Sequence, residues 1–261
     1  MCCKYILIAL AVCFTLLFMS CSSNQPSDNN NPKDTIPDYT NKLADPDFEN
    51  WKQFYSTTGT LLYEDPANGW WASLNKLALI GGPATSSKTT DAHSGKFAIK
   101  LETMKYGDFI ITGLLLSGVF DPILLKDVPN YVIEGKPFKK KPIKFSGYFK
   151  YFPADGDSCN FYINITRYNP VTNQRDTIAD ANLYAWDTVS TYRLFEMPLT
   201  YYRTDLEPDT IKIAIISSAG GRDYTGQGTP KVGSVILLDD LSLEIPTGII
   251  YLMDEKTKST K

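Results

Sequence analysis

The stretch that decides the fold is KPIKFSGYFKYF, residues 141–152. Every second side chain in it is apolar, as in a half-buried β-strand, whose successive side chains point to opposite faces. The side chains expected on the buried face are Ile143, Phe145, Phe149 and Tyr151. CNFYINITRY, residues 159–168, has the same period, with Phe161, Ile163 and Ile165 as its apolar set. These residues predict two strands that each bury one face.

The same pattern recurs along the rest of the chain, and helical periodicity is nearly absent. Short apolar runs bounded by Gly, Pro, Asp or Asn predict many strands with turns between them. These runs are KFAIKLE (96–102), YRLFEMPL (192–199), TIKIAIIS (210–217) and SVILLDDLSLEI (234–245). The sequence therefore predicts an all-β protein, an antiparallel β-sandwich with jelly-roll-like topology.

The first twenty residues predict a leader peptide. Lys4 precedes an uninterrupted apolar run over residues 5–19, which is shorter than the roughly 20 residues of a membrane-spanning helix. The run stops at Ser20-Cys21, which resembles a bacterial lipobox. We expect residues 1–20 to be a lipoprotein signal peptide and Cys21 to be lipidated. An ordinary signal peptide and a short membrane anchor are the alternatives.

Composition divides the remaining chain into three parts. Residues 21–45 are rich in Asn, Ser, Asp and Pro, which predicts a flexible tether. We expect the β-sandwich to occupy residues 46–246, and residues 247–261 to form a charged tail. Cys159 is the one cysteine after Cys21, which excludes an intramolecular disulfide and a thiolate zinc cluster in the body. The net charge of −3 argues against a nucleic-acid partner.

Motifs for catalysis are absent from the sequence. The one histidine, His93, precedes Ser94-Gly95 in an expected turn, and neither a nucleophile elbow, an HExxH zinc motif nor a phosphate-binding loop occurs. A glycosidase needs only two carboxylates about 5–9 Å apart, and sequence alone does not place such a pair. The sequence therefore favours a non-catalytic protein, and it leaves a glycoside hydrolase or lyase as an alternative.

Aromatic and amide side chains lie opposite the apolar sets of the two central strands. Tyrosine rings cover the apolar faces of sugar rings, and amides fix sugar hydroxyls. If the two strands pair, these side chains share one face, and the predicted glycan-binding residues on it are Tyr148, Tyr162, Asn164 and Tyr168. In GWWASLN (69–75), alternation places one tryptophan ring in the core and the other on the surface, and either Trp70 or Trp71 is a predicted ligand-binding residue. Ala72 and Leu74 share the parity of Trp70, which favours Trp70 as the core ring and Trp71 as the exposed platform. The alternative for the tyrosines is an ordinary outer face, because Tyr favours strands.

Several segments of the chain, in order, resemble the putative carbohydrate metabolism domain, a family of lipoprotein ectodomains from Bacteroidota. The segments are DFENW (47–51), GWWASLN (69–75), HSGKFAIKLET (93–103), GLLLSGVFD (113–121), GKPFKKKPIKFSGYFKYFPADGDS (135–158), IKIAIISSAGG (211–221) and VGSVILLDDLSLE (232–244). The resemblance implies a jelly-roll β-sandwich like those of carbohydrate-binding modules, and a role in the handling of glycans.

Two of these segments also resemble calcium-containing jelly rolls, in which an acid near the N-terminus and an aspartate of the last strand meet at a structural ion. The matching residues are Glu49, Asp239 and Asp240. The resemblance implies a structural calcium ion, which takes six to eight oxygen ligands. Strand alternation places Asp239 inward with Leu237 and Leu241, and its partner is either calcium, a Lys or Arg side chain, or turn amides.

These observations predict a non-catalytic protein that is lipid-anchored to the outer membrane and binds an oligosaccharide or polysaccharide at the cell envelope. The first alternative is a structural or adhesion component that contacts protein, suggested by the apolar stretch FIITGLLLSGVF (109–120). The second alternative is the carboxylate-based hydrolase or lyase.

Overall fold

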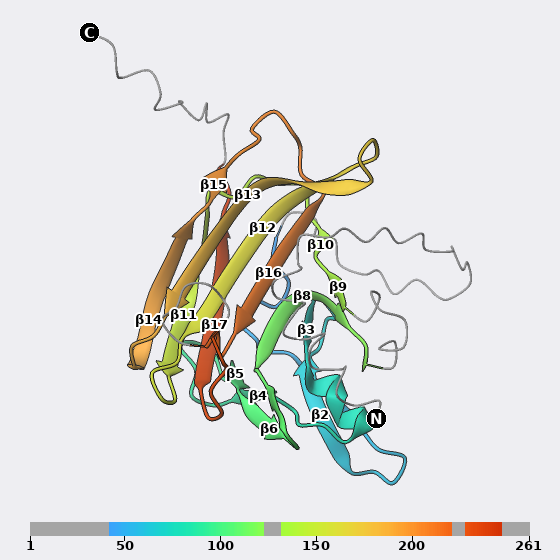
Figure 1. Ribbon diagram of the computed structural model, residues 1–261, viewed down its shortest axis with the longest axis vertical. Coiled ribbons are helices and arrows are strands. Elements are labelled where there is room, and N and C mark those ends of the chain that lie inside the picture. The colour runs from blue at the N-terminus through green and yellow to red at the C-terminus, as the bar shows by residue number, and fades with distance from the viewer. Residues whose placement is uncertain (1–41, 123–131, 221–227, 247–261) are drawn as a thin grey trace.

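The structure is a computed structural model, and it describes residues 42–122, 132–220 and 228–246 (Figure 1). The predicted lipidation site Cys21, the leader, most of the predicted tether and the tail after residue 246 lie outside the described residues. The described chain is almost entirely antiparallel β-structure, as the alternating pattern predicts, with one 3-10 helix, η1, over Asn75–Ile80. No helix in this described part is long and apolar enough to cross a membrane.

Two sheets pack face to face. The larger sheet has the strand order β15-β13-β12-β16-β8-β3, with β10 paired to β16 and β9 paired to β8. Its strands are β15 (Thr200–Tyr201), β13 (Gln174–Ala185), β12 (Cys159–Asn169), β16 (Thr210–Ile216), β8 (Leu114–Phe120), β3 (Trp71–Ser73), β10 (Lys136–Pro137) and β9 (Val132–Glu134). In Figure 1, β13, β12 and β16 cross in front of the smaller sheet.

The smaller sheet has the order β14-β11-β17-β5-β4. Its strands are β14 (Val189–Pro198), β11 (Lys144–Phe152), β17 (Val235–Glu244), β5 (Ala98–Glu102) and β4 (Ser86–Thr89). Two hairpins complete the fold, β1 (Trp51–Tyr55) with β2 (Leu61–Pro66) and β6 (Met104–Tyr106) with β7 (Phe109–Ile111). The two strands of the opening prediction, β11 and β12, thus lie in opposite sheets.

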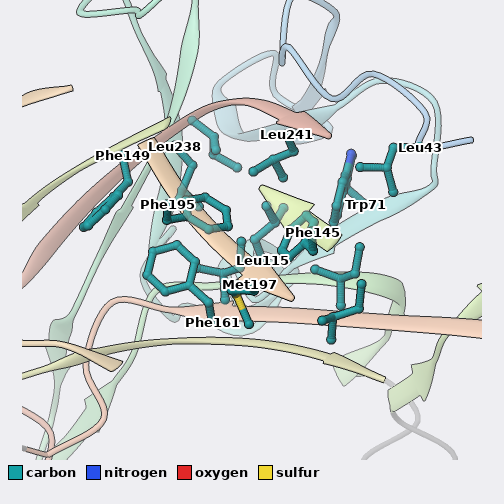
Figure 2. Close-up of a cluster of buried hydrophobic side chains, with 14 of the residues drawn as sticks. Leu43, Trp71, Leu115, Phe145, Phe149, Phe161, Phe195, Met197, Leu238 and Leu241 are labelled. Atoms are coloured by element: carbon teal, nitrogen blue, oxygen red, sulfur yellow. The ribbon is translucent and has the colours of Figure 1, made fainter. Parts of the chain in front are cut away.

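The core lies between the sheets and uses the predicted apolar faces. Phe145, Phe149 and Tyr151 of β11 are buried, as are Phe161 and its neighbours on β12. The ring centroids of Phe149 and Phe161 lie 5.3 Å apart at an interplanar angle of 76°, an edge-to-face contact across the sandwich (Figure 2). Strand alternation therefore assigned these inward residues correctly, whereas Ile143, the fourth residue predicted for the first stretch, lies before β11 and is half-buried.

A bulge in β17 creates a close approach at Gly147 in the smaller sheet. The pairing of β11 with β17 shifts between Ser146 and Tyr148, where Asp240 has a φ of 50°. A β-carbon on Gly147 would lie 2.6 Å from Leu241 Cδ2 and 3.0 Å from Phe195 Cε1. Gly147 is therefore required because the bulge brings Leu241 against the backbone of β11.

The apolar stretch 109–120 is part of the fold. It forms β7 and β8, and Ile111, Leu115, Leu116 and Phe120 are buried. A small second core, made of Leu74, Leu77, Ile111 and Phe120, lies beneath η1. The stretch that suggested a protein interface is therefore mostly core.

Candidate functional site

The outer face of the larger sheet holds polar and aromatic side chains from three neighbouring strands. Phe161, Ile163 and Ile165 point into the core, so Tyr162 and Asn164 point outward. We call this surface the polar face and define it by its central residues. They are Tyr162, Asn164, Asp180, Asn182, Tyr184, Tyr202, Lys212 and Ala214.

The strand register fixes which side chains on the polar face are neighbours. Tyr162 lies opposite Asn182 on β13 and opposite Ala214 on β16. Asn164 lies opposite Asp180 and Lys212 on the same two strands. Directly opposed side chains in a sheet have Cβ atoms about 4.5–5.5 Å apart, so the ring, the amides and both charges lie close together. The residue directly across from Tyr162 on β16 is thus the small Ala214.

The amides of the polar face are held by the sheet. Asn160, next to Tyr162 on the same face, donates from Nδ2 to Asn182 Oδ1 at 2.5 Å and to the Leu183 carbonyl at 3.1 Å. Asn164 is mostly buried, and its Nδ2 donates only long bonds of 3.5 Å, to Thr177 Oγ1 and to the Ala179 carbonyl. Asn182 is exposed and therefore presents its amide to solvent at the centre of the face.

Tyr202 belongs to the polar face, although it was not predicted from the sequence. Its side chain is 58% exposed, and its O–H donates to Asp180 Oδ1 at 3.0 Å, which raises the pKa of the phenol. The neighbouring Tyr201 turns inward and donates to the Pro142 carbonyl at 2.8 Å. Alternation across the Tyr201-Tyr202 pair was the signal that could have identified Tyr202.

Tyr168 lies away from the centre of the polar face. It is six residues beyond Tyr162 on β12, about 20 Å at the rise of a strand. Its O–H donates to Asn173 Oδ1 at 2.6 Å in the β12–β13 turn, and its N–H donates to Asp209 Oδ2 at 2.8 Å. Arg175 pairs with the same Asp209. The structure therefore places Tyr168 in the hydrogen-bonded turn region.

Tyr148 does not lie on the polar face. It is on the outer face of the smaller sheet, because β11 pairs with β14 and β17 and has no pairing with β12. One face of its ring is covered by His93, with the ring centroids 3.5 Å apart and the planes at 12°. The sequence grouped Tyr148 with Tyr162 on the assumption that their strands pair, and that grouping is wrong.

The expectation that Trp71 is an exposed platform is also wrong. Trp70 is 4% exposed and Trp71 is 2% exposed, and their rings meet edge-on with centroids 4.5 Å apart. Strand β3 begins only at Trp71, and Gly69 before it has a φ of 67°. Alternation does not extend across that turn, so both rings can face inward. Neither ring is placed to stack on a ligand.

The rest of this motif also serves the fold. Trp71 Nε1 donates to the Ala44 carbonyl at 2.8 Å, and the ring packs on Phe48. Asn75 is fully buried and bridges two strands, donating to the carbonyls of Glu64 and Ser86 and accepting from the Ser86 N–H at 2.9 Å. GWWASLN is therefore a structural motif of the first strands.

The three acids predicted to bind calcium hold the 93–97 loop by hydrogen bonds. Glu49 Oε1 accepts from the Lys96 N–H at 2.7 Å and from the Phe97 N–H at 3.0 Å. Asp239 is buried, as predicted, and accepts from the N–H groups of His93, Ser94 and Asp240. Gly95 is needed here, because a β-carbon would collide with Glu49 Oε1. Of the partners considered for Asp239, turn amides are the ones observed.

Asp240 completes this group from the next position on β17. Its Oδ2 lies 2.7 Å from His93 Nδ1, and its Oδ1 accepts from Ser94 Oγ at 2.8 Å. Calcium requires oxygen ligands around one point, whereas N–H donors point at these carboxylates. Within the described ranges, no group of three or more His, Cys, Asp or Glu is arranged to hold a metal. The observed donor set does not fit calcium, and an ion at these acids stays a prediction.

The one acid among the central residues of the polar face is Asp180. Asp180 has Asn164 and Thr200 as its cross-strand partners, so no acid lies directly opposite it. Asp65, whose pKa burial raises to about 6, lies on β2 and accepts from Ser73 Oγ at 2.5 Å and from Asn75 Nδ2 at 3.2 Å. Its place beside buried Asn75 indicates a role in the fold.

The two packed sheets define an antiparallel β-sandwich. The sequence profile of the family described as "putative carbohydrate metabolism domain" matches residues 47–244. The chain therefore belongs to this family, as the sequence motifs indicated. A comparison with curated proteins gives no match.

Solved structures with a similar fold include two proteins described as putative glycoside hydrolases. The one from Bacteroides thetaiotaomicron VPI-5482 is 19% identical, with a TM-score of 0.59, over 77% of this chain and 71% of that chain. The one from Bacteroides vulgatus ATCC 8482 is 21% identical, with a TM-score of 0.56, over 77% of this chain and 97% of that chain. At these identities the likeness establishes the common fold.

A family 61 carbohydrate-binding module in complex with β-1,4-galactotriose is also similar, at a TM-score of 0.38 and 8% identity over 79% of this chain and 99% of that chain.

Proposed function

We propose that this protein binds a glycan on the polar face without catalysing its cleavage, and that it does so while anchored by a lipid at Cys21 to the outer membrane. The observation that supports binding most directly is the position of Tyr162 beside exposed Asn182 and opposite Ala214. A half-buried ring with amides on one side and a small residue on the other matches the needs of a sugar ring. The apolar C–H face packs on the tyrosine, and the hydroxyls bond to the amides.

The ligand lies across the strands in this proposal. Tyr202 and Asp180 stand on the β15 side of Tyr162, and Lys212 and Ala214 stand on the β16 side. An oligosaccharide running from β15 towards β16 would meet an exposed ring, a carboxylate, amides and an ammonium group in turn. Such a row suits a chain of sugars better than a single small ligand.

Isothermal titration of the full-length protein against a panel of oligosaccharides and polysaccharides tests binding. Tyr162→Ala is expected to weaken the best ligand by about tenfold, the loss of one aromatic stacking contact. Ala214→Trp is expected to abolish binding because the indole would fill the space beside Tyr162. Tyr55→Ala is the matched control, since Tyr55 is an exposed tyrosine on β1, away from the polar face.

The outcomes separate the three classes of function. Folded protein that binds no member of the panel would count against glycan recognition for those ligands. Equal loss of affinity in Tyr55→Ala and Tyr162→Ala would place the site elsewhere. New reducing ends after incubation with the bound ligand would establish a hydrolase in place of a non-catalytic module.

A further inference from the structure

Asp180 of β13 and Tyr202, which directly follows β15, form a hydrogen-bonded pair on the polar face, and we call them the acceptor pair. The Tyr202 O–H donates to Asp180 Oδ1 at 3.0 Å. The backbone fixes the tyrosine, because its N–H donates to the Ile178 carbonyl at 2.8 Å. Strand β15 is the outermost strand of the larger sheet, beside β13 (Figure 1). The acceptor pair therefore has a defined arrangement at one side of the proposed glycan site.

The hydrogen bond within the acceptor pair leaves both residues with acceptors only. An ionised carboxylate has no donor, and the one donor of a phenol is its O–H. That O–H is given to Asp180, so the Tyr202 oxygen offers only lone pairs to a further partner. The hydrogen bond to Asp180 raises the pKa of the Tyr202 phenol, which keeps this proton in place at neutral pH. A ligand group that meets the acceptor pair must therefore donate.

The neighbouring strand does not supply such a donor. Asn164 lies directly opposite Asp180 on β12, but its Nδ2 donates within the sheet, to Thr177 Oγ1 and to the Ala179 carbonyl. Within residues 42–122, 132–220 and 228–246, Tyr202 is the residue whose side chain donates to the Asp180 carboxylate. The second carboxylate oxygen is therefore left for a ligand.

The arginines near the acceptor pair are matched to other acids. Arg203, the residue after the tyrosine, forms two hydrogen bonds to the Asp205 carboxylate, at 2.9 and 3.0 Å. Arg175, on the same strand as Asp180, pairs with Asp209. These guanidinium groups therefore do not offset the charge of Asp180, and the acceptor pair is a local negative site.

Lys212 carries the opposite charge on the far side of the polar face. Asn164 lies between Lys212 on β16 and Asp180 on β13. Adjacent strands are about 4.8 Å apart, so two strand spacings, about 10 Å, separate the backbones of the two charged residues. A glycan with a carboxylate on every sugar would bring one against Asp180, and a glycan with an ammonium on every sugar would bring one against Lys212. A neutral glycan meets neither repulsion.

We propose that the polar face selects neutral glycans over acidic ones, because the acceptor pair binds hydroxyl donors and repels carboxylates and sulfates. The inference rests on the proposed function, since it names the chemical class of the ligand bound there. Two adjacent sugar hydroxyls can donate to Asp180 Oδ2 and to the Tyr202 oxygen. A uronate or a sulfate brings acceptors and negative charge to the same place. Asp180 is thus the specificity-determining residue, and Tyr202 positions its carboxylate.

Matched forms of the same polysaccharide test this preference by titration into the full-length protein. Each neutral polysaccharide that carries primary hydroxyls is titrated before and after their oxidation to carboxylates. Each acidic polysaccharide is titrated before and after reduction of its carboxylates to hydroxyls. We expect the uncharged form of every bound polysaccharide to bind at least about tenfold more tightly. An acidic form that binds as tightly as its neutral counterpart would overturn the proposal.

Asp180→Asn assigns the preference to one residue, because the amide keeps the shape of the side chain, removes its charge and adds a donor. We expect the affinity for the neutral form to fall about tenfold and the affinity for the acidic form not to fall. Asp155→Asn is the matched control, since Asp155 is exposed in the β11–β12 turn, where its φ of 47° suits asparagine. An unchanged ratio of the two affinities in Asp180→Asn would overturn the proposal.

Tyr202→Phe tests whether the tyrosine acts through the carboxylate. It removes the donor to Asp180, so we expect weaker binding of the neutral form. Adding Tyr202→Phe to Asp180→Asn should then cost less than about twofold in affinity beyond Asp180→Asn alone, because the two residues act as one unit. Losses that multiply would contradict the acceptor pair.

These titrations separate the inference from the proposed function. If Tyr162→Ala weakens binding while Asp180→Asn leaves the ratio of neutral to acidic affinities unchanged, the polar face binds glycans and only this inference fails. If neither form of any polysaccharide binds, glycan recognition fails for the panel and the inference fails with it.

Discussion

The imidazole ring of His93 lies parallel to the ring of Tyr148, with centroids 3.5 Å apart, while its Nδ1 lies 2.7 Å from Asp240 Oδ2. Tyr192 meets the same imidazole edge-on at 5.6 Å. The one histidine of the chain thus joins the 93–97 loop to the outer face of the smaller sheet. Because His93 stacks on Tyr148, this outward-facing tyrosine helps to pack the 93–97 loop against the smaller sheet.

Tyr148→Ala is therefore expected to lower stability and leave glycan affinity unchanged. Loss of the stacked pair should cost about 1 kcal/mol of unfolding free energy. Urea unfolding followed by tryptophan fluorescence measures the first effect, and titration with the best ligand measures the second. Tyr162→Ala should instead lower glycan affinity and leave the unfolding free energy nearly unchanged. A drop in affinity for Tyr148→Ala alone would mean that the smaller sheet holds the site.

Asp239→Asn is expected to destabilise the fold by about 2–3 kcal/mol, because Asp239 is buried and accepts three backbone N–H bonds. An amide nitrogen in place of one oxygen would face donors with a donor. Asp205→Asn is the matched control, since Asp205 is exposed and its carboxylate accepts from the Arg203 guanidinium. Similar unfolding free energies for the two variants would show that the loop does not depend on Asp239.

Calcium binding at Glu49, Asp239 and Asp240 is checked by thermal unfolding with excess calcium and with a chelator. Because backbone N–H groups already point at Glu49 and Asp239, we expect the same midpoint in both conditions. A bound calcium ion would raise the unfolding midpoint as the calcium concentration rises. At a free calcium concentration about one hundred times the dissociation constant, the ion would add about 2.7 kcal/mol to the unfolding free energy. Such a shift, lost in Glu49→Gln, would establish the ion predicted from the sequence.

Asp65→Asn tests a buried carboxyl group. Burial raises the pKa of Asp65 from 3.8 to about 6, against the opposing effects of Ser73, Lys76 and Asn75. The folded state therefore binds this proton more tightly than the unfolded chain, so the contribution of Asp65 to stability grows as the pH falls from about 7 to about 4. The Asp65→Asn variant should have an unfolding free energy about 1 kcal/mol higher at pH 7 than the native protein. Its unfolding free energy should also increase less as the pH falls from about 7 to about 4.

The measurement for Asp65→Asn is urea unfolding at several pH values between 4 and 7. Burial also raises the pKa of Asp45 and Asp239, so part of the slope should remain in the variant. A variant with the slope of the native protein would mean that Asp65 is not the group that titrates.

Gly147→Ala is expected to cost about 1–3 kcal/mol, because the new methyl group would overlap Leu241 and Phe195. Gly156→Ala is the control, since Gly156 lies in a turn with open space around its Cα, although its φ of 71° adds some strain. The thermal unfolding midpoints of the two variants compare the cost of steric overlap at Gly147 with the cost of backbone strain at Gly156. Greater loss in the turn variant would contradict the close packing at the β17 bulge.

Much of the fold followed from local pattern. The inward set of β11 and β12, the nearly all-β class and the buried position of Asp239 were readable from alternation. The pairing of strands was not, because a two-residue period tells which side chains share a face and says nothing about the neighbouring strand. Tyr148 and Tyr162 have the same local pattern and lie on opposite sides of the molecule.

The candidate site was predicted in part for the same reason. Tyr162 and Asn164 were named from β12 alone, whereas Asp180, Asn182, Lys212 and Tyr202 became their neighbours only through the register of β13, β15 and β16. In GWWASLN, the left-handed turn at Gly69 interrupts the alternation, and the segment around Ala44 and Phe48 covers Trp71. The alternation of apolar residues within a strand does not predict which distant segment of the chain will cover that strand.

The sequence by itself determined the antiparallel β-sandwich class, the family and the apolar faces, because burial of every second side chain is a local requirement. The tertiary structure alone decided that Trp71 is core, that Tyr148 stacks on His93, and that Tyr162 stands among amides of other strands. Those outcomes depend on contacts between residues far apart in the chain, and the free energy of such contacts is set by which surfaces meet.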